Sequence, residues 1–600
     1  MQTSLSWSVS EQRDTALSLA MRPSSSARSI RFTSLQNRFP SMQRRMTMSL
    51  HSEEEGESLS SLAQTIIQTN QQQASPKIQL SLAIAGGGSS AISTLTSTSG
   101  ASSTFLSGQI LYSRQSFASM VSQPQIASVL RHEGIEDYHS RSNKFGYCSK
   151  GASQALAQAS LVSGMNQVGS GAVPENALQS LNCVVGVGCT SSLVSGGRMR
   201  SGRKSKTFIS WRTGLGIGKS YAIALDNGGD NGEGNDNLEP RTREEEDQLV
   251  GKLILSSVLD SIKGLNPAID NSGTELSNSI LLSRPGDLIQ SSNWSREETI
   301  ESMAQTVIDP NKSHIHAAMV LPNPSASSPT IMRPLSNAIL PSDPIIFPGS
   351  FNPPHLGHAT LAKAAVKAMT RKKRMEVAAL RNQAETTDKD LLDEIWNATE
   401  HEMYQSDSID TMDETDQGPF PVLFEMSLTN ADKPPMEAGE ASRRTSLFTH
   451  LQKDQPDSLP KDWGVLLTSA PLFIDKVRLL NQYLAPSSAF CAISPRRKLT
   501  FVIGTDTMIR IINPKYYGGE LESMLEAVRD MGREGAHFVV GGRVEQVVDT
   551  TSGLPHDTFV TGEKELKGLP FDVQEMFTII KEDDFRVDIS STELRAKQSE

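Results

Sequence analysis

Cysteine, long apolar runs and excess positive charge are scarce or absent in this sequence of 600 residues. It has 4 cysteines and no Cys-x-x-Cys pair, which excludes a disulfide scaffold and a cysteine-rich zinc module. No apolar run reaches the roughly 18 residues that a membrane-spanning helix needs. The net charge of -11 argues against a generally basic nucleic-acid-binding protein. We therefore expect a soluble protein of a reducing compartment, with neither nucleic acid nor a membrane as its partner.

The first fifty residues differ in composition from the rest of the chain. They contain twelve serines and seven arginines but no lysine, and Glu11 and Asp14 are their two acidic residues. This bias is typical of transit peptides that direct proteins to organelles, and a disordered tail is the alternative. Residues 1–75 are therefore set apart from the fold. A transit peptide would indicate a mitochondrial or plastid location, and a disordered tail would leave a cytoplasmic one.

Short apolar strands alternate with helical stretches between residues 76 and 265, which predicts an α/β domain. The expected strands are rich in Val, Ile and Phe and cover residues 80–85, 105–112, 182–188, 207–211 and 221–225. Helices are expected at residues 89–97 and 241–262, the second behind an acidic first turn that suits the helix dipole. Residues 266–342 are rich in Ser, Asn and Pro, and are interpreted as a linker with some local order, including a helix at 295–308.

Residues 343–600 carry a second set of alternating strands and helices. The expected strands are residues 345–347, 464–468, 499–503 and 537–540. Residues 371–418 begin with a basic cluster and then become strongly acidic. They are interpreted as a solvated insertion, with a lid or a partner-docking segment as the alternative. The chain is thus expected to be a two-domain α/β protein, and homo-oligomer formation is left open.

Two histidines after a turn that contains glycine and proline give the strongest functional signal. The string Ile345-Ile-Phe-Pro-Gly-Ser-Phe-Asn-Pro-Pro-His-Leu-Gly-His358 leads from a strand into a helix. At this spacing His355 and His358 lie on one face of the helix start, beside backbone amides that have no helical partner. Such a place suits a phosphate, and Gly349 lets the backbone approach closely. A zinc site, for which no third ligand is apparent, and a histidine pair without function are the alternatives.

A second possible anion site lies near the C-terminus. Ser590, Ser591 and Thr592 have the character of residues that cap and begin a helix, and Arg595 follows one turn later. Their hydroxyl groups, free amides and guanidinium group could together hold an anion. The alternative is an ordinary helix cap.

Both motifs resemble those of the nucleotidylyltransferase superfamily, namely H-x-G-H at residues 355–358 and I-S-S-T-x-x-R at residues 589–595. The resemblance implies a Rossmann-like parallel sheet and direct, in-line transfer of a nucleotidyl group from a nucleoside triphosphate. It implies that His355 and His358 are catalytic and that Mg²⁺ bridges the triphosphate oxygens. The nucleotide-binding residues implied are Phe347, Gly349, Gly504, Asp506, Ser591, Thr592 and Arg595, with Arg543 as a further phosphate contact.

The opening Gly-Ser-Phe-Asn-Pro and the I-S-S-T-x-x-R motif look most like the adenylyltransferases that join ATP to nicotinamide or nicotinate mononucleotide. This implies transfer of AMP to a phosphorylated small molecule and release of pyrophosphate. The acceptor-binding residues implied are Ser350, Phe351, Asn352 and Thr468. An enzyme acting on another phosphorylated metabolite, with ATP or CTP, is one alternative. A pseudoenzyme that binds nucleotide without turnover is the other.

The first domain resembles the CinA C-terminal family, whose active members deamidate nicotinamide mononucleotide. Residues 100–113 carry this resemblance. By alignment from them, Ala85 stands at the family's nucleophilic serine and Phe117 at its lysine. Because acyl chemistry needs an activated nucleophile, we expect no deamidase activity. Residues 213–220 nearly spell a phosphate-binding P-loop, but they lie between two strands and are interpreted as a hairpin loop.

Overall fold

The architecture is taken from a computed structural model of the chain. It describes residues 58–72, 77–135, 147–170, 177–194, 205–226, 239–265, 282, 284, 286–294, 299–310, 315–322, 331–334, 339–341, 343–383, 420–429, 434–484, 499–548 and 555–586. These residues form an α/β protein, as the sequence predicted, and their two large sheets are both mixed. No helix among them is both long and apolar enough to cross a membrane.

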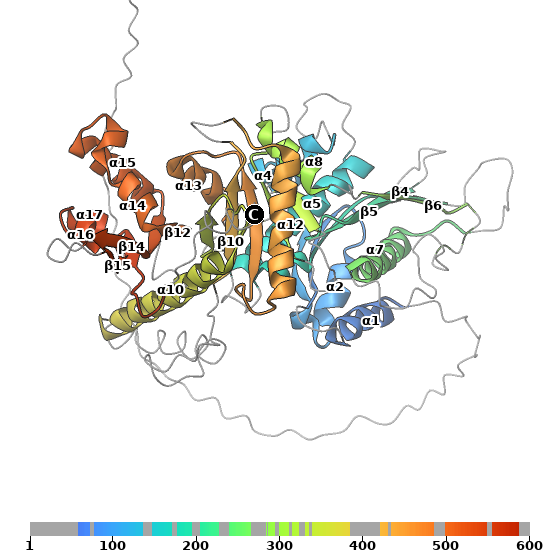
Figure 1. Cartoon of the computed structure of the whole chain (residues 1–600). Coiled ribbons are helices and arrows are strands. Elements are labelled where there is room, and N and C mark those ends of the chain that lie inside the picture. Colours follow the sequence, from blue (N-terminus) through green and yellow to red (C-terminus); the bar gives the residue numbers. More distant parts are fainter. Residues whose placement is uncertain are drawn as a thin grey trace, which may run out of the picture. The chain divides into compact units, whose positions relative to one another are not determined.

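The first sheet has six strands in the order β2-β1-β3-β4-β5-β6. Its strands are β1 Gln79–Ala85, β2 Phe105–Ile110, β3 Val184–Ser192, β4 Ser205–Thr213, β5 Gly218–Leu225 and β6 Leu288–Asn293. Strand β1 runs parallel to β2 and β3, whereas β3 to β6 are antiparallel neighbours. The helices of this part of the chain are α1 Leu59–Gln72, α2 Ser90–Ser97, η1 Ala101–Ser103, α3 Arg114–Val121, α4 Pro124–His132, α5 Lys150–Ser170, α6 Ala177–Asn182 and α7 Arg243–Leu265 (Figure 1).

Both faces of the first sheet are covered by helices. Leu80, Leu82 and Ile84 of β1 pack with α1, α2 and α7, and alternate residues of the strand face α5 on the opposite side. Helix α5 lies close to β3 because glycine occupies the positions beneath it. A Cβ atom added at Gly188 would lie 2.2 Å from the carbonyl oxygen of Ser153. A larger residue would therefore push the helix away from the sheet.

The second sheet has eight strands in the order β16-β13-β12-β9-β10-β11-β7-β8. Its strands are β7 Ala317–Leu321, β8 Ile331–Pro334, β9 Ile345–Pro348, β10 Val422–Ser427, β11 Trp463–Thr468, β12 Leu499–Gly504, β13 Ala536–Gly541 and β16 Phe577–Ile579. The six strands from β16 to β11 are parallel, and β7 and β8 add an antiparallel edge. Numbered along the chain, the parallel strands have the order 3-2-1-4-5-6, which is that of a Rossmann fold.

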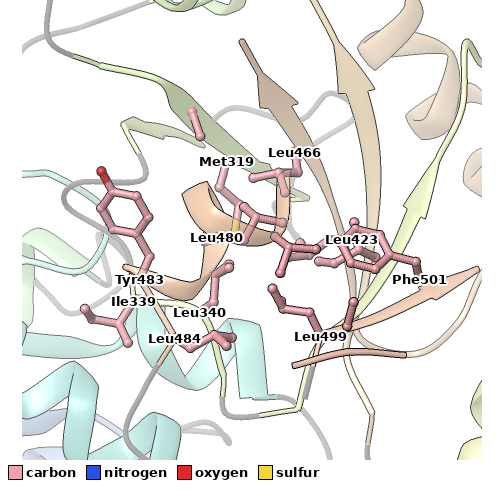
Figure 2. Close-up of a cluster of buried hydrophobic side chains, with 14 of the residues drawn as sticks. Met319, Ile339, Leu340, Leu423, Leu466, Leu480, Tyr483, Leu484, Leu499 and Phe501 are labelled. Atoms are coloured by element: carbon pink, nitrogen blue, oxygen red, sulfur yellow. The ribbon is translucent and has the colours of Figure 1, made fainter. Parts of the chain in front are cut away.

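Helices cover both faces of this sheet as well. They are α8 Ile300–Ile308, α10 Leu356–Gln383, α12 Ala438–Asp454, α13 Phe473–Asn481, α14 Thr505–Ile511, η5 Pro514–Tyr517, α15 Leu521–Arg533, α16 Glu563–Leu566 and α17 Phe571–Gln574, and a hairpin is formed by β14 Arg543–Val548 and β15 Pro555–Val560. Figure 2 shows part of the core on one face, where Leu423 of β10, Leu466 of β11 and Phe501 of β12 belong to one cluster with Leu480 of α13. Alternate strand residues, such as Phe347 and Phe424, pack on the opposite face with α10 and α12. A parallel sheet covered on both faces needs such continuous apolar strands.

The sequence-predicted strands are confirmed at all the expected places, although residue 182 ends α6 and β3 begins only at Val184. The hairpin expected at residues 213–220 is confirmed, since Thr213 N donates to the carbonyl oxygen of Ile217 and β4 pairs with β5. Its loop is shorter than expected and covers residues 214–217, because β5 begins at Gly218. Residues 266–342, interpreted as a linker, contribute more than local order. Within them β6 extends the first sheet and β7 and β8 extend the second.

The expected acidic insertion also begins differently from the prediction. Helix α10 continues to Gln383, so the basic residues 371–374 belong to it. There Arg371 and Lys373 form ion pairs with Asp584 and Asp343. The acidic residues between 384 and 418 lie outside the described residues.

Candidate functional site

The strand order of the second sheet places the histidine motif at the carboxyl end of its central strand β9. Strands β9 and β12 are neighbours, and the chain continues from β9 to β10 on one side and from β12 to β13 on the other. In open α/β sheets a ligand binds outside the carboxyl ends of the strands at such a switch point. Residues 349–358 follow β9, and Thr505 and Asp506 follow β12. The two segments therefore leave the sheet at the same edge.

Aromatic packing holds the loop after β9. The side chain of Phe351 is fully buried, and its ring lies 5.7 Å from that of Phe347 and 5.1 Å from that of Phe448 of α12. Gly349 donates its backbone N–H to the carbonyl oxygen of Glu425, at 2.9 Å, and a Cβ atom at Gly349 would lie 2.7 Å from the Phe351 ring. Phe347 and Phe351 were predicted to bind ligands, but their rings belong to this core. Any contact they make with a ligand would come from their backbone.

The histidines are held by the start of α10. The backbone N–H of His355 donates to Nδ1 of His358, at 3.2 Å, and the N–H of Gly357 donates to Nδ1 of His355, at 3.1 Å. The two ring centroids are 3.8 Å apart. Since each Nδ1 accepts a hydrogen bond, a neutral ring carries its proton on Nε2. Both imidazoles can then act as Nε2–H donors on one side of the helix start.

Burial keeps both imidazoles uncharged near neutral pH. It lowers the pKa of His358 to about 3, with a smaller contribution from repulsion by His355. Burial also lowers the pKa of His355. Loss of water disfavours the charged form of a base, which explains the direction of both shifts. The pair therefore offers hydrogen-bond donors and no full positive charge.

Residues at the ends of β12 and β13 meet on the other side of the switch point. The carboxylate of Asp506 forms an ion pair with the guanidinium group of Arg543, and both side chains are about half exposed. Apart from its chain neighbours, none of the described residues has an atom within 4 Å of a Cβ position built on Gly504, so they leave the space beside it open. The structure thus brings Asp506 and Arg543 together.

The second sequence motif lies beyond the part of the chain that can be described. Ser591, Thr592 and Arg595 are all outside the described residues, so their predicted nucleotide contacts stay a prediction. The chain that leads to them is held against the helix that carries the histidines. Asp584 forms ion pairs with Lys367 and Arg371 of α10.

The structure contains a buried ion pair near the ends of β10 and β11 that was not predicted from the sequence. Lys476 of α13 donates to Oε1 of Glu425, at 2.6 Å, and to the carbonyl oxygen of Ala470, at 2.9 Å. Thr468 donates its hydroxyl group to the same Glu425 oxygen. The Glu425 side chain is 1% exposed, and its Oε2 atom has no hydrogen-bond partner among the described residues. A charged residue inside the apolar run 422–426 was the signal that could have revealed it.

This buried ion pair explains why the side chain of Thr468 is not placed as the sequence predicted. It was expected to bind the acceptor, but its side chain is fully buried and its hydroxyl group is engaged by Glu425. A ligand could reach the backbone at this strand end more readily than the side chain. Ser350 and Asn352, the other acceptor-binding candidates with polar side chains, lie in the loop after β9.

The first sheet has a pocket of its own. It measures about 600 Å³ and is lined by residues at the starts of α2 and α7, namely Ser89, Ser90, Ser93, Thr94, Arg243, Glu244, Asp247 and Gln248. The carboxylate of Asp247 accepts from the backbone N–H groups of Gly88, at 2.7 Å, and Ser90, at 3.3 Å. Ala85 ends β1, and Phe117 is buried in α3. Neither residue can supply a nucleophile or a base, and the absence of deamidase activity stays a prediction.

Among the described residues, no group of three or more His, Cys, Asp or Glu side chains could hold a metal ion. The zinc interpretation of the two histidines therefore gains no third ligand from the described part of the chain.

Comparison with known proteins identifies one sequence family. Residues 346–411 match the cytidylyltransferase-like family, and the match includes both histidines and the loop before them. None of the curated proteins matches the chain. In structure, the chain is similar to the competence or damage-inducible protein from Enterobacter asburiae, with 9% sequence identity, a TM-score of 0.22 and coverage of 35% of this chain and 100% of that chain.

Two further solved structures are similar at the same level. Competence/damage-inducible protein CihA from Agrobacterium tumefaciens has 14% identity and a TM-score of 0.22, over 34% of this chain and 95% of that chain. A competence-damaged protein (CinA) superfamily protein from Enterobacter cloacae has 11% identity and a TM-score of 0.22, over 37% of this chain and 100% of that chain.

Removal of the buried cation should destabilise the protein. The substitution Lys476→Met leaves the Glu425 carboxylate buried without its partner, which typically costs about 3–5 kcal/mol. We expect a loss of this size in the free energy of unfolding, measured by chemical denaturation of the full chain. Arg478→Met on the same helix removes an exposed ion pair with Glu534 and should have a much smaller effect. Equal effects of the two substitutions would show that the Glu425–Lys476 pair is not buried as described.

The histidines should stay neutral through the physiological range. In ¹³C-histidine NMR spectra of the folded protein we expect no titration of His358 above about pH 5, since its pKa is about 3. The unfolded chain in urea, where histidine titrates near about 6.5, serves as the control. Because folding lowers this pKa, the stability that neutral His358 contributes is complete above about pH 6.5 and decreases as the pH falls toward 3. A midpoint near 6.5 in the folded protein would contradict its burial.

Proposed function

We propose that residues 343–600 form a nucleotidylyltransferase. It transfers AMP from ATP to a phosphorylated small molecule, with nicotinamide or nicotinate mononucleotide as the proposed acceptor, and releases pyrophosphate. One observation carries the proposal: two neutral imidazoles lie at a helix start directly after β9, at the switch point of a Rossmann-ordered sheet. The match of residues 346–411 to the cytidylyltransferase-like family supports it. The acceptor is proposed from the sequence resemblance of residues 349–353 and 589–595.

The described geometry suits stabilisation of charge on a phosphate. The Nε2–H groups of His355 and His358 would donate to oxygens of the α-phosphate and of the departing pyrophosphate. The positive end of the α10 helix dipole adds partial positive charge at the same place. Because backbone N–H groups already orient both rings, little reorganisation is needed when negative charge develops.

The reaction then needs no covalent enzyme intermediate. An oxygen of the acceptor's phosphate attacks the α-phosphorus of ATP, a new P–O bond forms, and the bond to pyrophosphate breaks on the opposite side. The electron pair of the broken bond leaves with pyrophosphate. Positioning and electrostatic stabilisation supply the acceleration in such transfers. The backbone of residues 349–352 would lie beside the acceptor, and Gly504 beside the nucleoside.

Magnesium is proposed to enter with the triphosphate. Mg²⁺ is usually held by substrate phosphates together with one or two carboxylates. Asp506, at the carboxyl end of β12, is a carboxylate at the switch point that fits this requirement, and it is balanced here by Arg543. The metal would neutralise charge on the leaving pyrophosphate.

The proposal predicts acceptor-dependent release of pyrophosphate. The full chain, incubated with ATP and Mg²⁺, should release pyrophosphate only when a phosphorylated acceptor is added. His358→Ala should lower turnover by at least about a hundredfold, the scale of losing one preorganised donor. His450→Ala removes an exposed histidine of α12 and should leave turnover unchanged. If no acceptor of a broad panel supports release with ATP or CTP, the pseudoenzyme interpretation replaces this one.

A further inference from the structure

Two arginines of α12 hold the loop that precedes the histidines. Helix α12 follows β10, so its first turns lie at the carboxyl edge of the sheet. Arg444 donates to the backbone carbonyl oxygen of Ser350, at 2.9 Å. Arg443 donates to the side-chain oxygen of Asn352, at 2.7 Å. Both guanidinium groups therefore lie at the loop that was predicted to bind the acceptor.

Glu440 orients the two arginines and balances one of their charges. It accepts from Arg443 at 2.7 and 2.8 Å and from Arg444 at 2.7 Å. These hydrogen bonds, those from Arg443 above all, lower the pKa of Glu440 to about 2, so its carboxylate is ionised at neutral pH. Two guanidinium groups and one carboxylate leave a net charge of one positive unit beside the loop.

This charge matters because, in the described part of the chain, the histidines and Lys476 beside the loop do not provide one. His355 and His358 are neutral near pH 7. Lys476 is buried and paired with Glu425. A phosphate that approaches the loop on the β10 side therefore finds its positive partner in α12.

The two arginines differ in how accessible they are. The side chain of Arg444 is 15% exposed, and its hydrogen bonds go to Ser350 and Glu440. The side chain of Arg443 is 50% exposed, so water and solutes reach it. Nε and Nη2 of Arg443 donate to Glu440 and Asn352, so a phosphate would be bound through the Nη1–H groups. Such charge-assisted hydrogen bonds are among the stronger ones in proteins.

We propose that Arg443, oriented by Glu440, binds the phosphate group of the acceptor, and that Arg444 is a positioning residue that fixes the backbone of Ser350. The inference rests on the proposed function, because it assigns one side of that site to a phosphorylated acceptor. It adds a binding residue that neither the motifs nor the family match indicates.

The test compares two ligands that differ by one phosphate group. Binding of nicotinamide mononucleotide and of its phosphate-free nucleoside to the full chain is measured by calorimetry. The wild type should bind the mononucleotide at least about tenfold more tightly, the scale of one charge-assisted hydrogen bond. Arg443→Gln should abolish this preference, and Arg443→Lys, which keeps the charge but not the planar guanidinium group, should retain part of it. Lys453→Gln, at an exposed cation near the end of α12, is the matched control and should keep it in full.

Three outcomes would overturn the assignment: a wild type without phosphate preference, an Arg443→Gln variant that keeps it, and a control that loses it. Kinetics gives an independent check, since Arg443→Gln should raise the KM for the acceptor at least about tenfold. The KM for ATP should change less than about twofold, and an equal rise in both would contradict the assignment of Arg443 to the acceptor. Failure of the proposed function is distinguishable from these results. An Arg443-dependent phosphate preference without pyrophosphate release would refute the transfer reaction and support the phosphate site.

Discussion

The hydrogen bonds from two backbone amides to the Nδ1 atoms of His355 and His358 are the constraint on which the account of this site depends. They orient both rings and leave each Nε2 atom as the donor. Burial then keeps the rings uncharged, so in the proposed reaction they would stabilise a phosphate as neutral hydrogen-bond donors. If the start of α10 were displaced from the sheet, tautomer, orientation and charge state would all change together.

The strand order brings the carboxyl ends of β10, β9 and β12 side by side. Strand β9 lies between β10 and β12, so the loop at residues 349–354 has the Glu425–Lys476 pair on one side and Asp506 with Arg543 on the other. The Glu425–Lys476 pair and the Asp506–Arg543 pair thus lie on opposite sides of this loop. We relate the β10 side to the acceptor and the β12 side to the nucleotide, and the exposed charge of Arg443 fits that division.

The sequence predicted the strands well, because short runs of Val, Ile, Leu and Phe suit a sheet that is buried on both faces. It also predicted the position of the histidines, whose motif is local. It did not predict the contacts of Glu425 with Lys476 or of Arg443 with Asn352, because each joins residues that are far apart along the chain. The polar composition of residues 266–342 gave no indication of strands β6, β7 and β8. Strand β6 pairs with β5 and β7 pairs with β11, and both of these partners lie outside that segment.

The most direct test of the account is a crystal structure of the full chain with Mg²⁺ and α,β-methylene-ATP, which cannot release pyrophosphate. We predict that oxygens of the α-phosphate lie within about 2.7–3.2 Å of the Nε2 atoms of His355 and His358, at the start of α10. Triphosphate bound elsewhere on the chain, or imidazoles turned so that Nδ1 faces the nucleotide, would contradict it.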